Sequence, residues 1–161
     1  MSLPACITTT PRYQIRESTV DEIARAENLL REYFEESISD EALRSAGINP
    51  DLDRYHALEN SGELFALAAH HNDGIVGYSI NIVIPHHRSS SLIVSVNDLI
   101  FVSKRHRNGG PGLALIRATE KMAKNRGAMT IMWCAKPTSP IIPILESMKY
   151  GMGDMIFSKV I

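Results

Sequence analysis

A glycine-rich and basic segment is the part of the chain whose residue types point most directly to chemistry. Residues 102–113 read Val-Ser-Lys-Arg-His-Arg-Asn-Gly-Gly-Pro-Gly-Leu and lie between an apolar stretch and a helical pattern. Glycines in such a turn allow a positive φ and keep side chains away from a ligand. The first N–H groups of a helix lie at the positive end of its dipole, where phosphate groups bind. The segment therefore indicates a phosphate-binding loop, to which Lys104, Arg105 and Arg107 add mobile positive charge.

Two other phosphate-binding motifs do not fit this segment. A P-loop requires Lys followed by Ser or Thr after its last glycine, whereas Leu113 and Ala114 follow here. A dinucleotide-binding fingerprint requires Gly or Ala three residues after Gly112, and Leu115 occupies that position. A glycine-rich turn that holds no ligand is the structural alternative.

The elements around this loop predict a mixed α/β fold with a strand–helix–strand unit near residue 110. A capping box formed by Thr19 and Glu22 starts a helix that runs through Phe34. A second helix over 39–58 is interrupted at Gly47–Pro50. Further helices are expected over 112–126 and 140–150, and strands over 13–17, 64–71, 75–84, 92–102, 128–135 and 155–161. The runs 92–102 and 128–135 are typical of strands buried on both faces.

Composition excludes several classes of protein. The chain has 161 residues, which fits a single domain over 1–161, with residues 1–12 expected as a flexible tail. Its hydrophobic share of 44% argues against disorder, yet no apolar run is long enough to span a membrane. The first residues do not resemble a secretory signal, and two cysteines are too few for a disulfide framework. A cytoplasmic location is the simplest expectation.

Charge is distributed unevenly along the chain. The first 75 residues carry 14 acidic and 6 basic side chains, and the remaining residues carry 4 acidic and 11 basic ones. Acidic amphipathic helices would explain this split without any ligand. A second interpretation is that two partners of opposite charge meet on one domain. The overall charge of −1 argues against a nucleic-acid partner, and no surface aromatics alternate with the basic residues.

Residues 107–112, Arg-Asn-Gly-Gly-Pro-Gly, match the Arg/Gln-x-x-Gly-x-Gly/Ala acetyl-CoA signature of the GNAT superfamily of N-acetyltransferases. The sequence Leu-Glu-Ser-Met-Lys-Tyr at 145–150 also resembles that family's Tyr-Glu-Lys-Leu-Gly-Phe motif. Val102 and the helix that ends at Arg126-Gly127-Ala128 fall at the family's spacings. The order of elements agrees from about Tyr13 to Ile161, so the resemblance covers nearly the whole chain.

The resemblance implies a central, mostly antiparallel sheet with a splayed parallel strand pair, flanked by helices. It implies acetyl-CoA as acyl donor and an amine as acceptor, joined by direct attack. The main chain of Leu99, Ile100, Phe101 and Val102 would pair with the pantetheine arm, and N–H groups there would stabilise the oxyanion. The diphosphate would be held by main-chain groups of five loop residues: Arg107, Asn108, Gly109, Gly110 and Gly112. Leu113 and Thr138 would make further contacts with the cofactor. The basic half of the chain would then meet the cofactor, and the acidic half a cationic amine.

A carboxylate in the apolar strand before the loop is the candidate general base. An amine must lose its proton before it attacks a thioester, and Asp98 could accept that proton directly or through water. Pairing with Arg or a backbone N–H is the structural alternative for Asp98. Asn97 should face the opposite side and could only orient a water, although a β-bulge could exchange the two.

The family's usual Tyr acid corresponds to Leu145 here, so the departing thiolate would lack a side-chain acid. Tyr150 is expected to pack, and Lys149 stands where the family has glycine. The missing acid favours the alternative of a non-catalytic acyl-CoA-binding protein that acts through protein contacts. No metal site is expected, because the adjacent histidines at 70–71 and 86–87 would point to opposite strand faces. An apolar last strand ending at Ile161 could pair across a homodimer.

Overall fold

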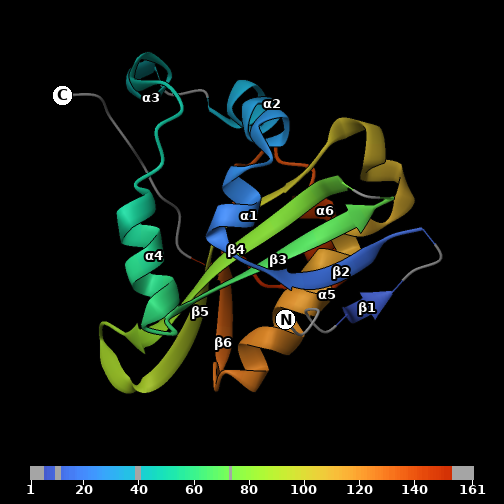
Figure 1. The fold of residues 1–161 in the computed structure, drawn as a ribbon. Helices are drawn as coiled ribbons and strands as arrows, with labels where there is room; N and C mark the ends of the chain where they lie inside the picture. The colour runs from blue at the N-terminus through green and yellow to red at the C-terminus, as the bar shows by residue number, and fades with distance from the viewer. Residues whose placement is uncertain (1–5, 10–11, 39–40, 73, 154–161) are drawn as a thin grey trace.

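The computed structural model describes residues 6–9, 12–38, 41–72 and 74–153, and all six described strands form one sheet in the order β1-β2-β3-β4-β5-β6 (Figure 1). The expected last strand over Met155–Ile161 lies outside the described residues. The strands are β1 Cys6–Thr9, β2 Gln14–Ser18, β3 Leu64–His71, β4 Gly74–His86, β5 Ser89–Val102 and β6 Thr130–Trp133. The helices are α1 Val20–Ala24, α2 Glu27–Ser37, α3 Glu41–Ala46, α4 Leu52–Asn60, the 3₁₀ helix η1 Lys104–Gly109, α5 Pro111–Asn125 and α6 Ile142–Ser147.

The sheet has the mixed topology that the resemblance implies. Strands β1 to β5 pair antiparallel with their neighbours, and β6 pairs parallel with β5. A parallel neighbour requires a crossover, and α5 supplies it between β5 and β6. The predicted mostly antiparallel sheet with one parallel pair is therefore confirmed.

Helices cover both faces of the sheet, and each face has its own apolar core. On one face α5 places Ala114, Leu115 and Ala118 against Ile15 and Leu67. The opposite core is formed by α1, α2 and α4 over the other side of β3, β4 and β5; it contains Val20, Ile23, Leu29, Leu64, Ala66, Tyr78, Ile80 and Phe101. The residues after the loop are thus fixed to one face of the sheet, and the acidic N-terminal helices to the other.

Two local sequence signals correspond to helix boundaries in the structure. Thr19 accepts a hydrogen bond from the Glu22 N–H, and the Glu22 side chain accepts from the Thr19 N–H, so the capping box is confirmed. The helix predicted through Phe34 is interrupted, because α1 ends at Ala24 and α2 begins at Glu27. The predicted break at Gly47–Pro50 is confirmed as the gap between α3 and α4.

Four expectations about local structure are wrong. Within the expected flexible tail, Cys6–Thr9 form a strand that pairs with β2. Strand β6 is shorter than predicted and half-exposed, with Met132 and the preceding Met129 on the surface. The strands expected over 75–84 and 92–102 are longer than predicted, since β4 reaches His86 and β5 begins at Ser89. The last helix is shorter than the expected 140–150 and runs from Ile142 to Ser147, with the Ser139 hydroxyl accepting a hydrogen bond from the Ile141 N–H at 3.5 Å.

The turn after α6 keeps its shape although it lacks the family's glycine. Lys149 has a φ of 67°, in the left-handed region, and the Tyr150 N–H donates to Leu145 O at 3.0 Å. For a residue with a Cβ, this left-handed conformation is less favourable by about 1 kcal/mol or more.

We therefore expect Lys149→Gly to raise the free energy of unfolding by about 1 kcal/mol, because glycine adopts this conformation without strain. Urea unfolding measures the change. Lys149→Ala is the matched control, since it removes the charge but keeps the Cβ, and its stability should stay near that of the wild type. Equal stabilities of the Gly and Ala variants would contradict the argument.

Candidate functional site

The three glycines of the loop between β5 and α5 have different surroundings. A Cβ on Gly109 would lie 2.4 Å from the hydroxyl oxygen of Tyr13, so this glycine allows close packing. Gly110 has a φ of 88° and precedes the first residue of α5. A Cβ on Gly110 would meet nothing within 4 Å, and one on Gly112 would meet only Val102 Cγ2, at 3.9 Å. Open space therefore lies beside Gly110 and Gly112.

The start of α5 presents main-chain N–H groups beside that space. Pro111 occupies the first helical turn and has no N–H, and no side chain caps this helix end. Gly112 and Leu113 therefore carry the first N–H groups of the helix, which have no partner within the helix. Such groups can receive the oxygens of a phosphate.

Two of the three basic side chains expected to be mobile are bound to α2 instead. The Arg107 guanidinium binds the Glu36 carboxylate with two contacts of 2.8 Å, and its Nε donates to Val102 O at 3.0 Å. Lys104 Nζ lies 3.4 Å from Glu36, and the Lys104 N–H donates to Glu32 at 2.7 Å. The expectation of mobile charge is therefore wrong for Arg107, whose charge Glu36 neutralises, whereas the exposed Lys104 ammonium only lies beside the same carboxylate.

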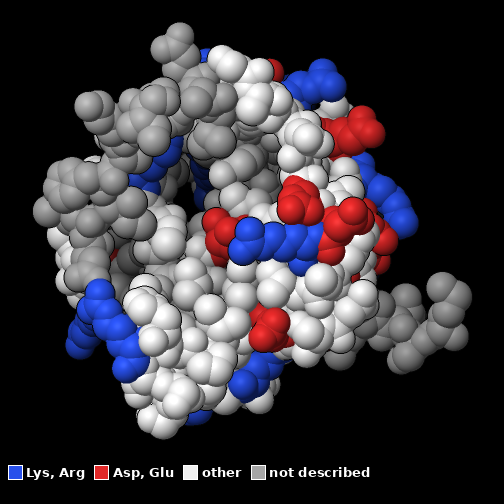
Figure 2. All heavy atoms as spheres, turned by 90° about the vertical axis from the view of Figure 1, so that its left-hand side faces the viewer, with Lys and Arg blue, Asp and Glu red and all other residues white. Residues whose placement is uncertain are grey.

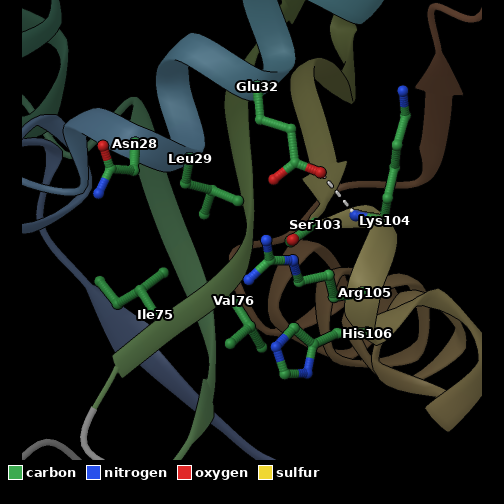
Figure 3. A pocket seen from close by; sticks show the side chains of 9 residues that line it. All are labelled: Asn28, Leu29, Glu32, Ile75, Val76, Ser103, Lys104, Arg105 and His106. Atoms are coloured by element: carbon green, nitrogen blue, oxygen red, sulfur yellow. Dashed lines mark hydrogen bonds between the residues drawn. The ribbon is translucent and has the colours of Figure 1, made fainter.

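Arg105 differs from these two residues. It extends into a hollow of about 580 Å³ between α2, the start of β4 and the loop (Figure 3). Glu32 lies above Arg105 in this view, whereas Lys104 extends away. The lining residues are Asn28, Leu29, Glu32, Ile75, Val76, Ser103, Lys104, Arg105 and His106. Neither Gly110 nor Gly112 lines the hollow, so it is separate from the open space at the helix start.

Opposite charges also meet elsewhere on the surface. On the face that carries α4 and the β4–β5 hairpin, Figure 2 shows acidic and basic side chains next to one another. Arg126, at the end of α5, binds Glu17 of β2 at 3.1 Å. Glu17 and Glu36 of the acidic half thus pair with basic residues of the other half, so part of the charge split joins the two halves of the chain.

Strand β5 has an open edge directly before the loop. Its pairing with β6 ends at Asn97 and Trp133, whereas β5 continues to Val102. The Ser103 N–H donates to Val76 O, and alternate residues of an antiparallel strand face the same neighbour. The main-chain groups of Ile100 and Val102 are therefore directed away from β4. Among the strands that the structure describes, none pairs with this edge.

A β-bulge places the two candidate catalytic residues on opposite faces. Ile80 pairs with Leu99 and Asn81 with Asn97, so Asp98 is the extra residue on β5. Asn97 is 1% exposed on the α5 side, and Asp98 is exposed on the side of α4. The expectation of a strand buried on both faces is thus wrong at Asp98, because the bulge turns it outward.

Asp98 has a partner that the sequence does not indicate. The Tyr55 hydroxyl, on α4, donates to Asp98 Oδ2 at 2.5 Å. Burial raises the pKa of Tyr55, and the hydrogen bond to Asp98 raises it further. Burial and the Asp98 charge also raise the pKa of Tyr33 on α2. Both hydroxyls therefore keep their protons at neutral pH. No spacing rule connects Tyr55 with Asp98, 43 residues later, so only the packing of α4 on the sheet reveals the pair.

The C-terminal candidates lie in the segment that follows β6 and around α6. Leu145 is buried, and Thr138 lies exposed in the turn after β6. Tyr150 donates to Glu120 at 2.6 Å and packs edge-on against Trp133. Burial, followed by the bond to Glu120, raises the pKa of Tyr150 to about 12. These contacts give Tyr150 a packing partner on β6 and a polar one on α5.

Residues 23–146 match the sequence profile described as "Acetyltransferase (GNAT) family". The chain belongs to this acetyltransferase family. The match spans the bulge, the glycine loop and all of α5, so the resemblance read from residues 107–112 is confirmed. A search of curated protein sequences finds no match.

Several solved structures share the fold. An aminoglycoside acetyltransferase, HMB0005, from an uncultured soil metagenomic sample is 22% identical, with a TM-score of 0.72 over 92% of this chain and 98% of that one. The ribosomal-protein-alanine N-acetyltransferase of Brucella melitensis biovar Abortus 2308 is 21% identical, with a TM-score of 0.63 over 92% and 97%. AAC(6')-Iy, solved with a bisubstrate analogue of CoA, is 16% identical, with a TM-score of 0.69 over 92% and 97%. At these identities the likeness shows the fold alone.

None of the helices in the described part of the chain is both long and apolar enough to cross a membrane.

The Glu36–Arg107 pair makes a prediction about acid stability. The Arg107 hydrogen bonds lower the pKa of Glu36 in the folded protein. A lowered carboxylate pKa stabilises the fold above the unfolded value of 4.5, and this stability is lost as pH falls through the folded value.

We expect Glu36→Gln to lower the free energy of unfolding by about 1 kcal/mol at pH 7, where this half-buried pair is charged. The difference from wild type should disappear as pH falls from about 5 towards 3. Urea unfolding at several pH values measures both curves. Glu35→Gln, its neighbour on α2, is the control. A difference that stays constant down to pH 3 would exclude the ion pair as its cause.

Proposed function

We propose that this protein transfers an acetyl group from acetyl-CoA to an amine by direct attack of the amine nitrogen on the thioester carbonyl. The observation that carries the proposal is the Asp98 bulge. It places an exposed carboxylate where β5 and β6 separate, at the beginning of the open strand edge that leads to the glycine loop.

The loop fits a diphosphate. A Cβ on Gly110 would meet no neighbouring atom within 4 Å and one on Gly112 only Val102 Cγ2, and the N–H groups of Gly112 and Leu113 lie at the same helix start. Positive charge at this place comes from the α5 dipole, since Glu36 neutralises Arg107. We assign diphosphate binding to main-chain groups of residues 107–113, while the Arg107 side chain holds the loop against α2.

The open edge of β5 fits the amide-bearing pantetheine arm. Leu99–Val102 would add it as a strand, and Ile100 contributes the N–H and C=O groups that face this edge. Val102 O already accepts a bond from Arg107, so only its N–H is free for this role. Thr138, after β6, lies on the turn where a further contact would form.

Asp98 would take the proton from the attacking amine. Acetyl-CoA supplies the acetyl group as a thioester, and an N–C bond forms while the C–S bond breaks. Tyr55 fixes the Asp98 carboxylate by donating to Oδ2, which leaves Oδ1 to accept the proton directly or through water. The Ile100 N–H, which among residues 99–101 is the one that faces the open edge, would stabilise the oxyanion. A thiol with a pKa near 8.5 can leave as thiolate and take its proton from solvent, which suits the apolar Leu145.

A second candidate is an acyl-CoA-binding protein that does not catalyse transfer. Buried Leu145 favours it, because the family's acid is absent at that position. Release of free thiol from acetyl-CoA, measured over a panel of amines, separates the two. If the protein binds CoA but no amine of the panel causes thiol release from acetyl-CoA, the result would support the non-catalytic binding function.

Gly112 offers a test of the diphosphate site that spares the fold. In Gly112→Asp the new carboxylate should stabilise the first turn of α5 but repel the diphosphate. We expect CoA affinity, measured by calorimetry, to fall by at least about 10-fold, with an unchanged or higher melting temperature. Gly112→Asn is the control for bulk, and it should bind more tightly than the Asp variant. Equal affinities of the two variants would remove this end of α5 from the site.

The proton acceptor can be tested by the pH dependence of kcat/KM. Asp98→Asn should lower kcat by about 100-fold or more and abolish the acidic limb of the profile. Tyr55→Phe should keep that limb and lower kcat less, since it removes only the bond that orients the carboxylate. An Asp98→Asn enzyme with the wild-type profile would show that another group accepts the proton.

A further inference from the structure

A buried polar cluster lies between the bulge and α5, and neither the loop nor the Asp98–Tyr55 pair accounts for it. Ser79 and Asn81 of β4, Asn97 of β5 and Thr119 of α5 are each 0–1% exposed. We refer to these four residues as the Asn97 cluster. Burying so many polar groups costs free energy unless they bond to one another, so their arrangement calls for a physical reason.

The Asn97 carboxamide spans the bulge. Its Nδ2 lies 3.1 Å from Leu99 O and 3.2 Å from Ile80 O, the two residues that pair immediately beyond the extra residue. A bulge leaves the extra residue, here Asp98, unpaired and disrupts the ladder at this point. The two amide N–H groups of Asn97 face carbonyl oxygens of both strands there.

The rest of the cluster holds the carboxamide in place. Asn97 Nδ2 also lies 2.9 Å from Asn81 Oδ1 and 3.2 Å from Ser79 Oγ, and Asn81 Nδ2 donates to Ser79 Oγ at 2.9 Å. Ser79 Oγ lies 3.1 Å from Thr119 Oγ1. The chain of contacts therefore runs from the bulge to α5, whose first turn follows the glycine loop.

We propose that Asn97 is a positioning residue that keeps the bulge in the form that turns the Asp98 carboxylate towards Tyr55. A one-residue change in register would reverse the face on which each side chain points, and Asp98 would leave Tyr55. This role replaces the water-orienting role expected from the sequence, because a side chain that is 1% exposed and surrounded by acceptors does not face the solvent. The catalytic consequence rests on the proposed function, whereas the positioning of Asp98 does not.

The test compares Asn97→Ala with a matched control on the same strand face. Ser95 is two residues earlier, is buried, and its hydroxyl has no hydrogen-bond partner among the described residues. Ser95→Ala therefore removes a buried hydroxyl without touching the bulge, and both activity and the environment of Asp98 should stay as in the wild type. Asn97→Ser keeps one donor and should give an intermediate effect, which keeps the test available if Asn97→Ala does not fold.

The first measurement needs no activity. In protein labelled with carboxyl-¹³C aspartate, Asp98→Asn identifies the Asp98 resonance, and Tyr55→Phe shows how far it moves when the hydrogen bond is lost. Asn97→Ala should move the Asp98 resonance in the same direction, and Ser95→Ala should leave it in place. An unmoved resonance in Asn97→Ala, or in Asn97→Ser if only that variant folds, would overturn the proposal.

The second measurement is kinetic. Asn97→Ala should lower kcat by about 10-fold or more and shift the acidic limb of the kcat/KM profile, with KM for acetyl-CoA within about twofold of wild type. A folded variant with wild-type kcat and profile would reduce Asn97 to a structural role. If the wild type acetylates no amine, the proposed function fails, while the ¹³C result still decides whether Asn97 positions Asp98.

Discussion

One extra residue in β5 determines the geometry of the candidate site. Side chains of a strand alternate between its faces, so inserting Asp98 reverses the alternation on either side of it. Leu99 and Phe101 therefore pack against the N-terminal helices, whereas Asn97 faces α5. The same insertion coincides with the end of the β5–β6 pairing. A single irregularity thus turns a carboxylate outward and exposes a strand edge at one point of the sheet.

The acidic helix α2 helps to hold the glycine loop in its conformation. Glu32 and Glu36 are four residues apart on α2, on one face of the helix, and both bind the segment that begins at Lys104. This contact makes the shape of the glycine loop dependent on the helix that also carries Tyr33. Helix α2 therefore connects the loop after β5 with Tyr33, although these segments are far apart in the sequence.

The neutralisation of Arg107 changes which forces can hold a phosphate here. A guanidinium with two bonds to a carboxylate and one to a carbonyl has few donors left for a ligand. Main-chain N–H groups and the α5 dipole are directional and cannot move away. A binding site formed by these donors would fix the position of the proposed diphosphate along the strand edge relative to Asp98.

The sequence by itself determined what depends on local preferences: the capping box at Thr19, the break before Pro50, the glycine turn before α5 and, through the 107–112 motif, the family. It could not determine contacts between distant segments. The pairing of Tyr55 with Asp98, of Glu36 with Arg107 and of Gly109 with Tyr13 was decided by the tertiary structure. These contacts depend on how helices pack on a sheet and where strand register shifts, and both are set by many weak interactions summed over the whole core, which no short motif encodes.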